Sequence, residues 1–89
     1  MEIKNIFTHS RFDKGYKKLP KKVKEEAKKK EKIFRRDPFD PRLRTHKLHG
    51  KEKEVWAFWI NHRYRIKFIF LNNKEVLFLD IGTHDIYKK

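Results

Sequence analysis

The sequence predicts an α+β fold in which an N-terminal strand and a two-helix hairpin precede an antiparallel β-meander. Apolar residues at helical spacing occur only in the first half of the 89-residue chain, whereas the second half holds runs of aromatic and branched residues that suit strands. A chain of this length can bury only one small core, so we expect a single domain over residues 1–89. The meander should form a curved sheet that carries both helices on one face.

Short local patterns place the N-terminal strand and the two helices. Residues 2–7 alternate polar and apolar side chains, which predicts a strand. Ser10 and Asp13 have the spacing of a capping box, so a helix should begin there. A second helix is expected over residues 20–36, because the residue that precedes Pro38 is steered away from helical geometry.

Four strands are predicted beyond a proline-punctuated loop. They occupy residues 44–50, 54–60, 63–71 and 74–82. The breaks at Asn61-His62 and Asn72-Asn73 are short, and asparagine tolerates the positive φ of tight hairpin turns. If both breaks are two-residue loops, the register of the meander is fixed, and Phe58 and Asp80 both lie across from Arg65.

This register divides the side chains of the meander between two faces. One face is almost wholly apolar and should receive the helices. Its members are Val55, Ala57, Trp59, Tyr64, Ile66, Phe68, Phe70, Leu77, Leu79 and Ile81. The opposite face mixes cations with aromatic rings, and we interpret it as an RNA-binding surface because cations neutralise phosphates and aromatic rings stack with bases. The candidate RNA-binding residues are Arg63, Lys67, Lys47, Trp56 and Phe58.

A solvated polar face is the alternative interpretation of the same cations, since antiparallel sheets commonly keep one face in water. On that interpretation Arg65 and Asp80 form only an exposed cross-strand ion pair, worth less than ~1 kcal/mol. Trp56 and Phe58 favour a binding surface, because large aromatic side chains on a polar face require a cover or a partner.

Charge and composition narrow the classes of partner and compartment. The formal net charge of +13 and the pI near 10.1 favour a polyanionic partner, with nucleic acid foremost. Cysteine is absent, which excludes disulfide frameworks and thiolate zinc sites. No apolar run approaches the roughly 20 residues that span a bilayer, and residues 1–10 lack the pattern of a signal peptide. We therefore expect a cytoplasmic protein with no membrane partner.

The histidines of the chain favour acid–base chemistry over a metal site. His46 and His49 look like a ligand pair, but residues three apart on a strand point to opposite faces. Cleavage of RNA without a metal requires a base for the 2′-hydroxyl, an acid for the departing 5′-oxygen and cations for the phosphate. Histidine suits either proton role, and arginine suits the phosphate. The candidate catalytic residues are His84, Arg65, His46 and Tyr87, with no metal and no cofactor.

Four stretches in this order of elements carry a resemblance to a known family: YKKLPKKVKEEAKKK, DPFDPRLRTHKLHG, YRIKF and IGTHDIY. The chain resembles the RelE/ParE superfamily of toxins from type II toxin–antitoxin systems, and within it the RelE-type messenger-RNA interferases with YafQ-like features. The resemblance implies a RelE-like fold and a toxin that binds in the ribosomal A site and cuts the exposed messenger RNA.

The same resemblance implies roles for individual residues. Arg65 matches the arginine of the catalytic face, and His84 matches the general acid or base after the last glycine. His46 resembles an upstream histidine of the YafQ-like group, and Tyr87 resembles its C-terminal aromatic residue. The aspartate-tryptophan pair that YafQ-like toxins carry before the central strand is replaced here by Arg63-Tyr64.

The resemblance also implies a cognate antitoxin, acidic or amphipathic, that covers the basic face in a hetero-oligomer. Residues 11–36 contain thirteen Lys or Arg against four Asp or Glu. This surplus suits ribosomal RNA or such an antitoxin, although a solvated helix exterior explains it equally well. Two other functions remain open: a ParE-like inhibitor of DNA gyrase, which needs no general acid or base, and a non-catalytic RNA-binding member of the family.

Overall fold

A computed structural model describes residues 1–49 and 54–88 of the chain. Its elements in order are β1 (Asn5–Thr8), α1 (Ser10–Lys17), α2 (Lys21–Arg36), η1 (Pro41–Leu43), β2 (His46–Lys47), β3 (Val55–Trp59), β4 (Tyr64–Phe70), β5 (Glu75–Thr83) and η2 (His84–Lys88). This order confirms the prediction of a strand, two helices and a meander. In the described part of the chain, no helix is long and apolar enough to cross a membrane.

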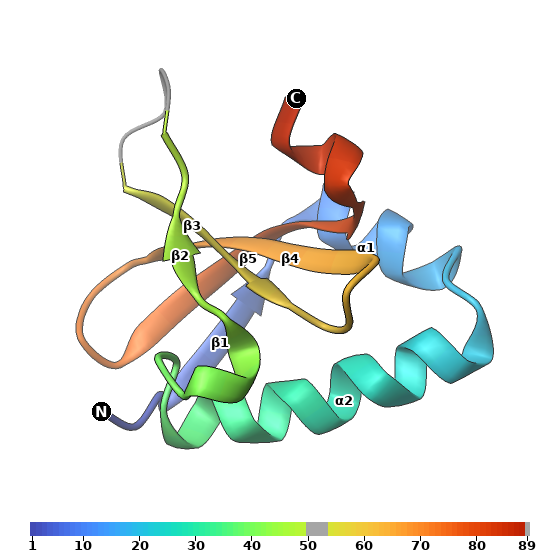
Figure 1. Ribbon diagram of the computed structural model, residues 1–89. Coiled ribbons are helices and arrows are strands. Elements are labelled where there is room, and N and C mark those ends of the chain that lie inside the picture. The colour runs from blue at the N-terminus through green and yellow to red at the C-terminus, as the bar shows by residue number, and fades with distance from the viewer. Residues whose placement is uncertain (50–53, 89) are drawn as a thin grey trace.

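The five strands form one open sheet in the order β1-β5-β4-β3-β2. Strands β2 to β5 pair antiparallel, as the predicted meander requires, whereas β1 joins the edge parallel to β5. Figure 1 shows α2 on one side of the sheet and the C-terminal turn η2 on the other. We call the side away from α2 the open face.

The start of α1 differs from the prediction in its capping residue. The cap is His9, whose Nδ1 accepts the backbone N–H of Arg11 at 3.0 Å, so the capping role predicted for Ser10 is wrong. Asp13 does lie in the first turn, where the helix dipole favours a carboxylate. Helix α2 occupies the residues predicted for it to within one position.

Phe34 of α2 is the centre of the core. Its ring centroid lies 4.8 Å from that of Phe58, 5.0 Å from that of Phe68 and 5.5 Å from that of Phe78. Phe12 of α1 packs on Phe78 at 5.3 Å, so both helices cover the same face of the sheet. All five rings are buried, and each contributes about 1.5–3 kcal/mol to the stability of the fold. The helices hold the sheet from one side and leave the open face to η2 and to solvent.

The first hairpin of the meander has a three-residue loop instead of the predicted two. The side chain of Asn61 stabilises the longer loop, because its Oδ1 accepts two backbone N–H groups at 2.9 and 2.8 Å. Trp59 then lies across from Arg65, in the place predicted for Phe58. A shift of one residue exchanges the two faces of a strand, so every side chain of β3 lies on the face opposite to the predicted one.

The register of β5 is shifted twice. A backbone hydrogen bond closes its hairpin one residue later than predicted, and a bulge beside Lys67 adds a further residue. Asp80 therefore lies across from Lys67, and Gly82 lies across from Arg65. Because two shifts of one residue restore the original face, Asp80 keeps the face that the sequence predicts for it.

The predicted membership of the apolar face is corrected accordingly. Five residues predicted to lie beneath the helices lie on the open face instead: Val55, Ala57, Trp59, Leu77 and Leu79. Their places under the helices are taken by Trp56, Phe58, Val76 and Phe78. The prediction holds for Tyr64, Ile66, Phe68, Phe70 and Ile81.

Candidate active site

The four side chains that the sequence predicts to be catalytic lie together on the open face. Arg65 comes from β4, His46 from β2, and His84 and Tyr87 from η2. The Tyr87 hydroxyl is 3.5 Å from Nε2 of His46, and the Tyr87 ring centroid is 4.6 Å from that of His84. Arg65 is close enough to the same hydroxyl to bond with it. We call these four residues the open-face cluster.

Gly82 allows η2 to fold back over the open face. A Cβ at this position would lie 2.9 Å from Cγ2 of Ile86, which is closer than real Cβ atoms approach a neighbour. Gly82 is also the residue across from Arg65, so η2 occupies the space above that pair. The glycine of the C-terminal motif thereby sets how closely Tyr87 approaches Arg65.

Arg65 is buried and held from several sides. Its Nη1 donates to the carbonyl oxygens of Asn61 at 2.7 Å and Tyr64 at 3.2 Å. Its Cζ lies 3.8 Å from the ring centroid of Trp59, a cation–π contact. A guanidinium has five N–H donors, so a group held through one nitrogen keeps others for Tyr87 and for an anion. The positive charge of Arg65 is therefore held in a fixed position before any ligand binds.

Two residues that the sequence did not nominate extend this site. Trp59 lies under Arg65, and Cζ of Arg44 lies 4.6 Å from the same indole ring. Arg44 has a left-handed backbone, with φ of 52°. Arg44 lies before β2 and is not extended, so the two-residue period of a strand does not predict its position. The sequence also does not predict that Trp59 lies on this face, because that depends on the length of the hairpin loop.

The hydrogen bond of His46 to a backbone carbonyl determines which of its ring nitrogens carries the proton. Nδ1 lies 2.9 Å from the carbonyl oxygen of Arg44. A carbonyl only accepts, so Nδ1 carries the proton, and we assign the tautomer on that basis. In neutral His46 the lone pair is then on Nε2, the atom that faces the hydroxyl of Tyr87. This nitrogen can take up a proton.

Tyr87 and His84 differ in their surroundings. Burial raises the pKa of Tyr87 above 10.0, and the charge of Arg65 and its hydrogen bond offset part of that rise. The hydroxyl therefore stays protonated at neutral pH and can donate a hydrogen bond. His84 is exposed at the start of η2, with its ring edge against that of Tyr87. It can exchange a proton with solvent or with a bound molecule.

Two of the five candidate RNA-binding residues lie beneath the helices. Phe58 is fully buried in the core, and Trp56 packs against Phe39 at 5.4 Å and Phe70 at 5.9 Å. The prediction that these aromatic rings belong to an RNA-binding face is wrong. Its cause is the loop length of the first hairpin, which turns both rings toward the helices.

The three basic candidates lie in different parts of the structure. Lys47 follows His46 in β2 and points away from the open face, and its Nζ lies 3.2 Å from Oε1 of Glu54. Lys47 therefore does not share the open face with His46, because neighbouring residues of a strand face opposite ways. Arg63 is exposed in the first hairpin loop. Lys67 is buried on the open face, across from Asp80.

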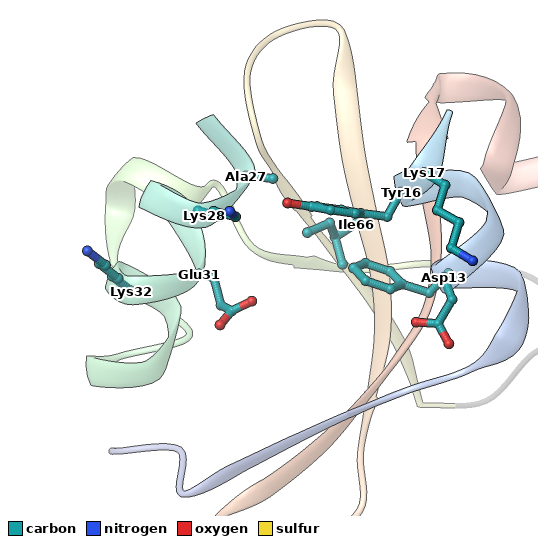
Figure 2. Close-up of a pocket in the computed structure, with 9 residues that line it drawn as sticks. Asp13, Tyr16, Lys17, Ala27, Lys28, Glu31, Lys32 and Ile66 are labelled. Carbon is teal, nitrogen blue, oxygen red and sulfur yellow. The ribbon is translucent and has the colours of Figure 1, made fainter. Parts of the chain in front are cut away.

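A groove of about 710 Å³ lies on the helix side of the molecule, away from the open-face cluster. Figure 2 shows Tyr16 beside Ile66 in this groove, with α2 on one side and α1 on the other. Its lining residues are Phe12, Asp13, Tyr16, Lys17, Ala27, Lys28, Glu31, Lys32 and Ile66. The molecule therefore presents two separate surfaces: a cationic cluster on the open face, and an apolar groove with lysines at its rim.

Comparison with known proteins identifies the fold. No family model and no curated protein shows significant similarity to this sequence. Among solved structures, the YoeB/ParE toxin from Agrobacterium tumefaciens matches with a TM-score of 0.78 and 13% identity, over 91% of this chain and 99% of that one. The E. coli DinJ-YafQ toxin-antitoxin complex matches with 0.75 and 18%, over 97% of both chains. The archaeal RelE-RelB complex from Pyrococcus horikoshii OT3 matches with 0.71 and 17%, over 93% of this chain and 96% of that one.

Proposed function

We propose, with the RelE/ParE toxin fold of this chain as the premise, that the protein is the toxin of a type II toxin–antitoxin system. It is a ribosome-dependent endoribonuclease that cuts messenger RNA in the A site, in the cytoplasm. The observation that carries the proposal is the open-face cluster. Two histidines, a protonated phenol and a fixed arginine gather on the face that α2 leaves uncovered.

The cluster supplies a base and an acid for attack by the 2′-hydroxyl of the messenger. Nε2 of His46 takes the 2′-hydroxyl proton while that oxygen bonds to phosphorus. His84 gives a proton to the 5′-oxygen as its bond to phosphorus breaks. The products are a 2′,3′-cyclic phosphate and a 5′-hydroxyl, so protons and charge balance within the cluster.

The other residues of the site stabilise charge on the phosphate. Arg65 is held by two carbonyls and the Trp59 ring, so it needs no rearrangement when negative charge grows on the phosphate oxygens. The Tyr87 hydroxyl has one proton, which faces Nε2 of His46 in the structure, and it can turn to donate that proton to the same oxygens when RNA binds. Arg44 adds a second guanidinium above Trp59. Donors placed in this way are typically worth 10²–10³-fold in rate each.

The ribosome is the partner that the charge of the chain favours. A net charge of +13 on 89 residues attracts a polyanion at long range, and most of the surplus lies on exposed positions of α1 and α2. On the ribosome, ribosomal RNA would bind the helices and present the messenger to the open face.

The groove between α1 and α2 suits an antitoxin segment. Its floor is apolar, with Phe12, Ala27 and Ile66. Lys28 and Lys32 are exposed at its rim, so the segment that fits it has one apolar face and acidic flanks. Solved relatives include toxin chains in complex with DinJ and with RelB. We infer that the cognate antitoxin binds this groove and forms a hetero-oligomer with the toxin.

A translating ribosome reaction tests the proposal. The purified protein is added, and messenger 5′ ends are mapped by primer extension for the wild type, His84→Ala, Arg65→Lys and the control His62→Ala. His62 is an exposed histidine at the tip of the first hairpin, outside the cluster. Cleavage within A-site codons should fall by about 10²–10⁴-fold in His84→Ala and stay unchanged in His62→Ala.

Two results would contradict the proposal. Intact messenger in every reaction would favour a gyrase-binding protein or a non-catalytic RNA-binding protein of the same fold. Equal cleavage by the wild type and His84→Ala would show that His84 is not the general acid. Arg65→Lys keeps a charge but loses the planar fork, so loss of activity there separates bidentate phosphate binding from simple attraction.

A further inference from the structure

A second hollow lies on the open face next to the open-face cluster. Its volume is about 310 Å³, and its lining residues are His9, Arg11, Val55, Lys67, Leu79 and Asp80. Lys67 lies two residues beyond Arg65 on the same face of β4, which places it ~7 Å along the strand. That distance is close to the spacing of neighbouring nucleotides in an extended strand. An RNA bound at Arg65 would therefore reach this hollow with its next nucleotide.

Asp80 is the unusual residue of this hollow. Its side chain is only 4% exposed. One carboxylate oxygen, Oδ1, accepts the backbone N–H of Ile81 at 2.9 Å. The other, Oδ2, has no hydrogen-bond partner within the described part of the chain. A buried carboxylate oxygen without a donor is costly, so a ligand that donates to it gains affinity.

We propose that this hollow binds a nucleobase of the messenger and that Oδ2 of Asp80 selects it. The proposal rests on the ribonuclease function proposed above. An ionised carboxylate only accepts hydrogen bonds, so it favours adenine, cytosine or guanine, whose exocyclic amino groups donate. Uracil offers one N–H between two carbonyl oxygens, and those oxygens would face the carboxylate unfavourably. Asp80 lies across from Lys67, beside the bulge of β5, and both residues line the hollow.

The remaining lining residues suit the rest of a nucleotide. Val55 and Leu79 are apolar and can contact the faces of a base. Arg11, at the start of α1, is exposed and can reach a phosphate. A single base-selective contact of this type discriminates by about fivefold to a hundredfold. Asp80 would thus determine sequence preference at one position beside the scissile bond.

Binding of RNA analogues that cannot be cut tests this inference. Tetranucleotides of deoxyadenosine, deoxycytidine and deoxyuridine lack the 2′-hydroxyl, so their affinities report binding alone. The wild type should bind the adenine and cytosine forms at least about fivefold more tightly than the uracil form. Asp80→Asn should reduce this ratio below about twofold, because an amide also donates. Glu75→Gln, at a half-buried carboxylate of the same strand that does not line the hollow, should keep the wild-type ratio.

The outcomes separate this inference from the proposed function. A wild-type ratio near one overturns it, as does an unchanged ratio in Asp80→Asn. The wild-type ratio needs no variant, so the test holds even if Asp80→Asn fails to fold. Backbone amide shifts at Ile81 and Val55 on adding the adenine form should locate the base in the hollow, and shifts confined to the helices would contradict that. Base preference without messenger cleavage would support a base-selective hollow and contradict the ribonuclease function.

Discussion

Tyr87 is the residue on which the open-face cluster depends, because it contacts both histidines and approaches Arg65. Tyr87→Phe keeps the ring between the histidines and removes only the hydroxyl. We expect messenger cleavage to fall by about 10²-fold, the typical effect of removing one placed donor from a charged transition state. Cleavage rates in the translating reaction measure this, and equal rates for the two proteins would show that the hydroxyl has no role.

The same substitution should alter the response of stability to alkali. The pKa of Tyr87 is raised in the folded state, so the native protein holds this proton longer than the unfolded chain does. Stability therefore falls as the pH rises above 10.0 toward the folded pKa. Tyr87→Phe removes that loss. Denaturant unfolding of both proteins on either side of this pH checks the sign, and a steeper loss in the variant would contradict it.

Two tryptophans of β3 test which side of the strand faces the site. Trp59 lies under Arg65, whereas Trp56 packs with Phe39 and Phe70 on the helix side. Trp59→Leu should weaken messenger cleavage, because the indole supports two guanidinium groups at about 0.5–2 kcal/mol each. Trp56→Leu should lower thermal stability and leave cleavage by the folded fraction near the wild-type rate. If Trp56→Leu weakened cleavage and Trp59→Leu lowered only thermal stability, the result would support the two-residue loop predicted from the sequence.

At the scale of elements, α1 is fixed to β5 by a close approach at Gly15. A Cβ there would lie 2.8 Å from the backbone oxygen of Ile81, which cannot move without disturbing the strand. Gly15→Ala improves helix propensity by about 1 kcal/mol but introduces this clash, which costs about 1–3 kcal/mol. We expect a net fall in the free energy of unfolding, measured with denaturant. Lys14→Ala, an exposed neighbour, should change it by less than about 0.5 kcal/mol, and a stabilised Gly15→Ala would contradict the packing.

The meander shows which features of an element the sequence determines and which it does not. The identity and order of the strands follow from composition, His46 and Arg65 follow from motifs on those strands, and Tyr87 follows from the motif after the last strand. The pairing of β3 depends on whether a hairpin loop has two or three residues. The side-chain bonds of Asn61 to two backbone N–H groups settle that question, and a pattern of residue types does not contain them. The position of the bulge in β5 likewise depends on packing.

At the scale of the molecule, the open-face cluster and the groove between α1 and α2 lie on opposite sides of the sheet. Charge reversal at the groove should therefore weaken antitoxin binding and leave the residues of the open-face cluster in place. Lys28→Glu combined with Lys32→Glu should weaken neutralisation by the cognate antitoxin roughly tenfold, since each rim charge is worth about 0.5–1 kcal/mol. Lys29→Glu, exposed on α2 but outside the groove, is the control. Equal neutralisation of all three proteins would place the antitoxin elsewhere.

The chemical nature of the cut ends tests the central claim most directly. Messenger fragments from the translating reaction are assayed for a free 5′-hydroxyl and for a 2′,3′-cyclic phosphate. Attack by the 2′-hydroxyl with His46 as base predicts both groups in the wild type, and their formation should slow by about 10²–10⁴-fold in His46→Ala. Fragments that carry 5′-phosphates, or 5′-hydroxyl ends formed equally fast by His46→Ala, would contradict acid–base cleavage by the open-face cluster.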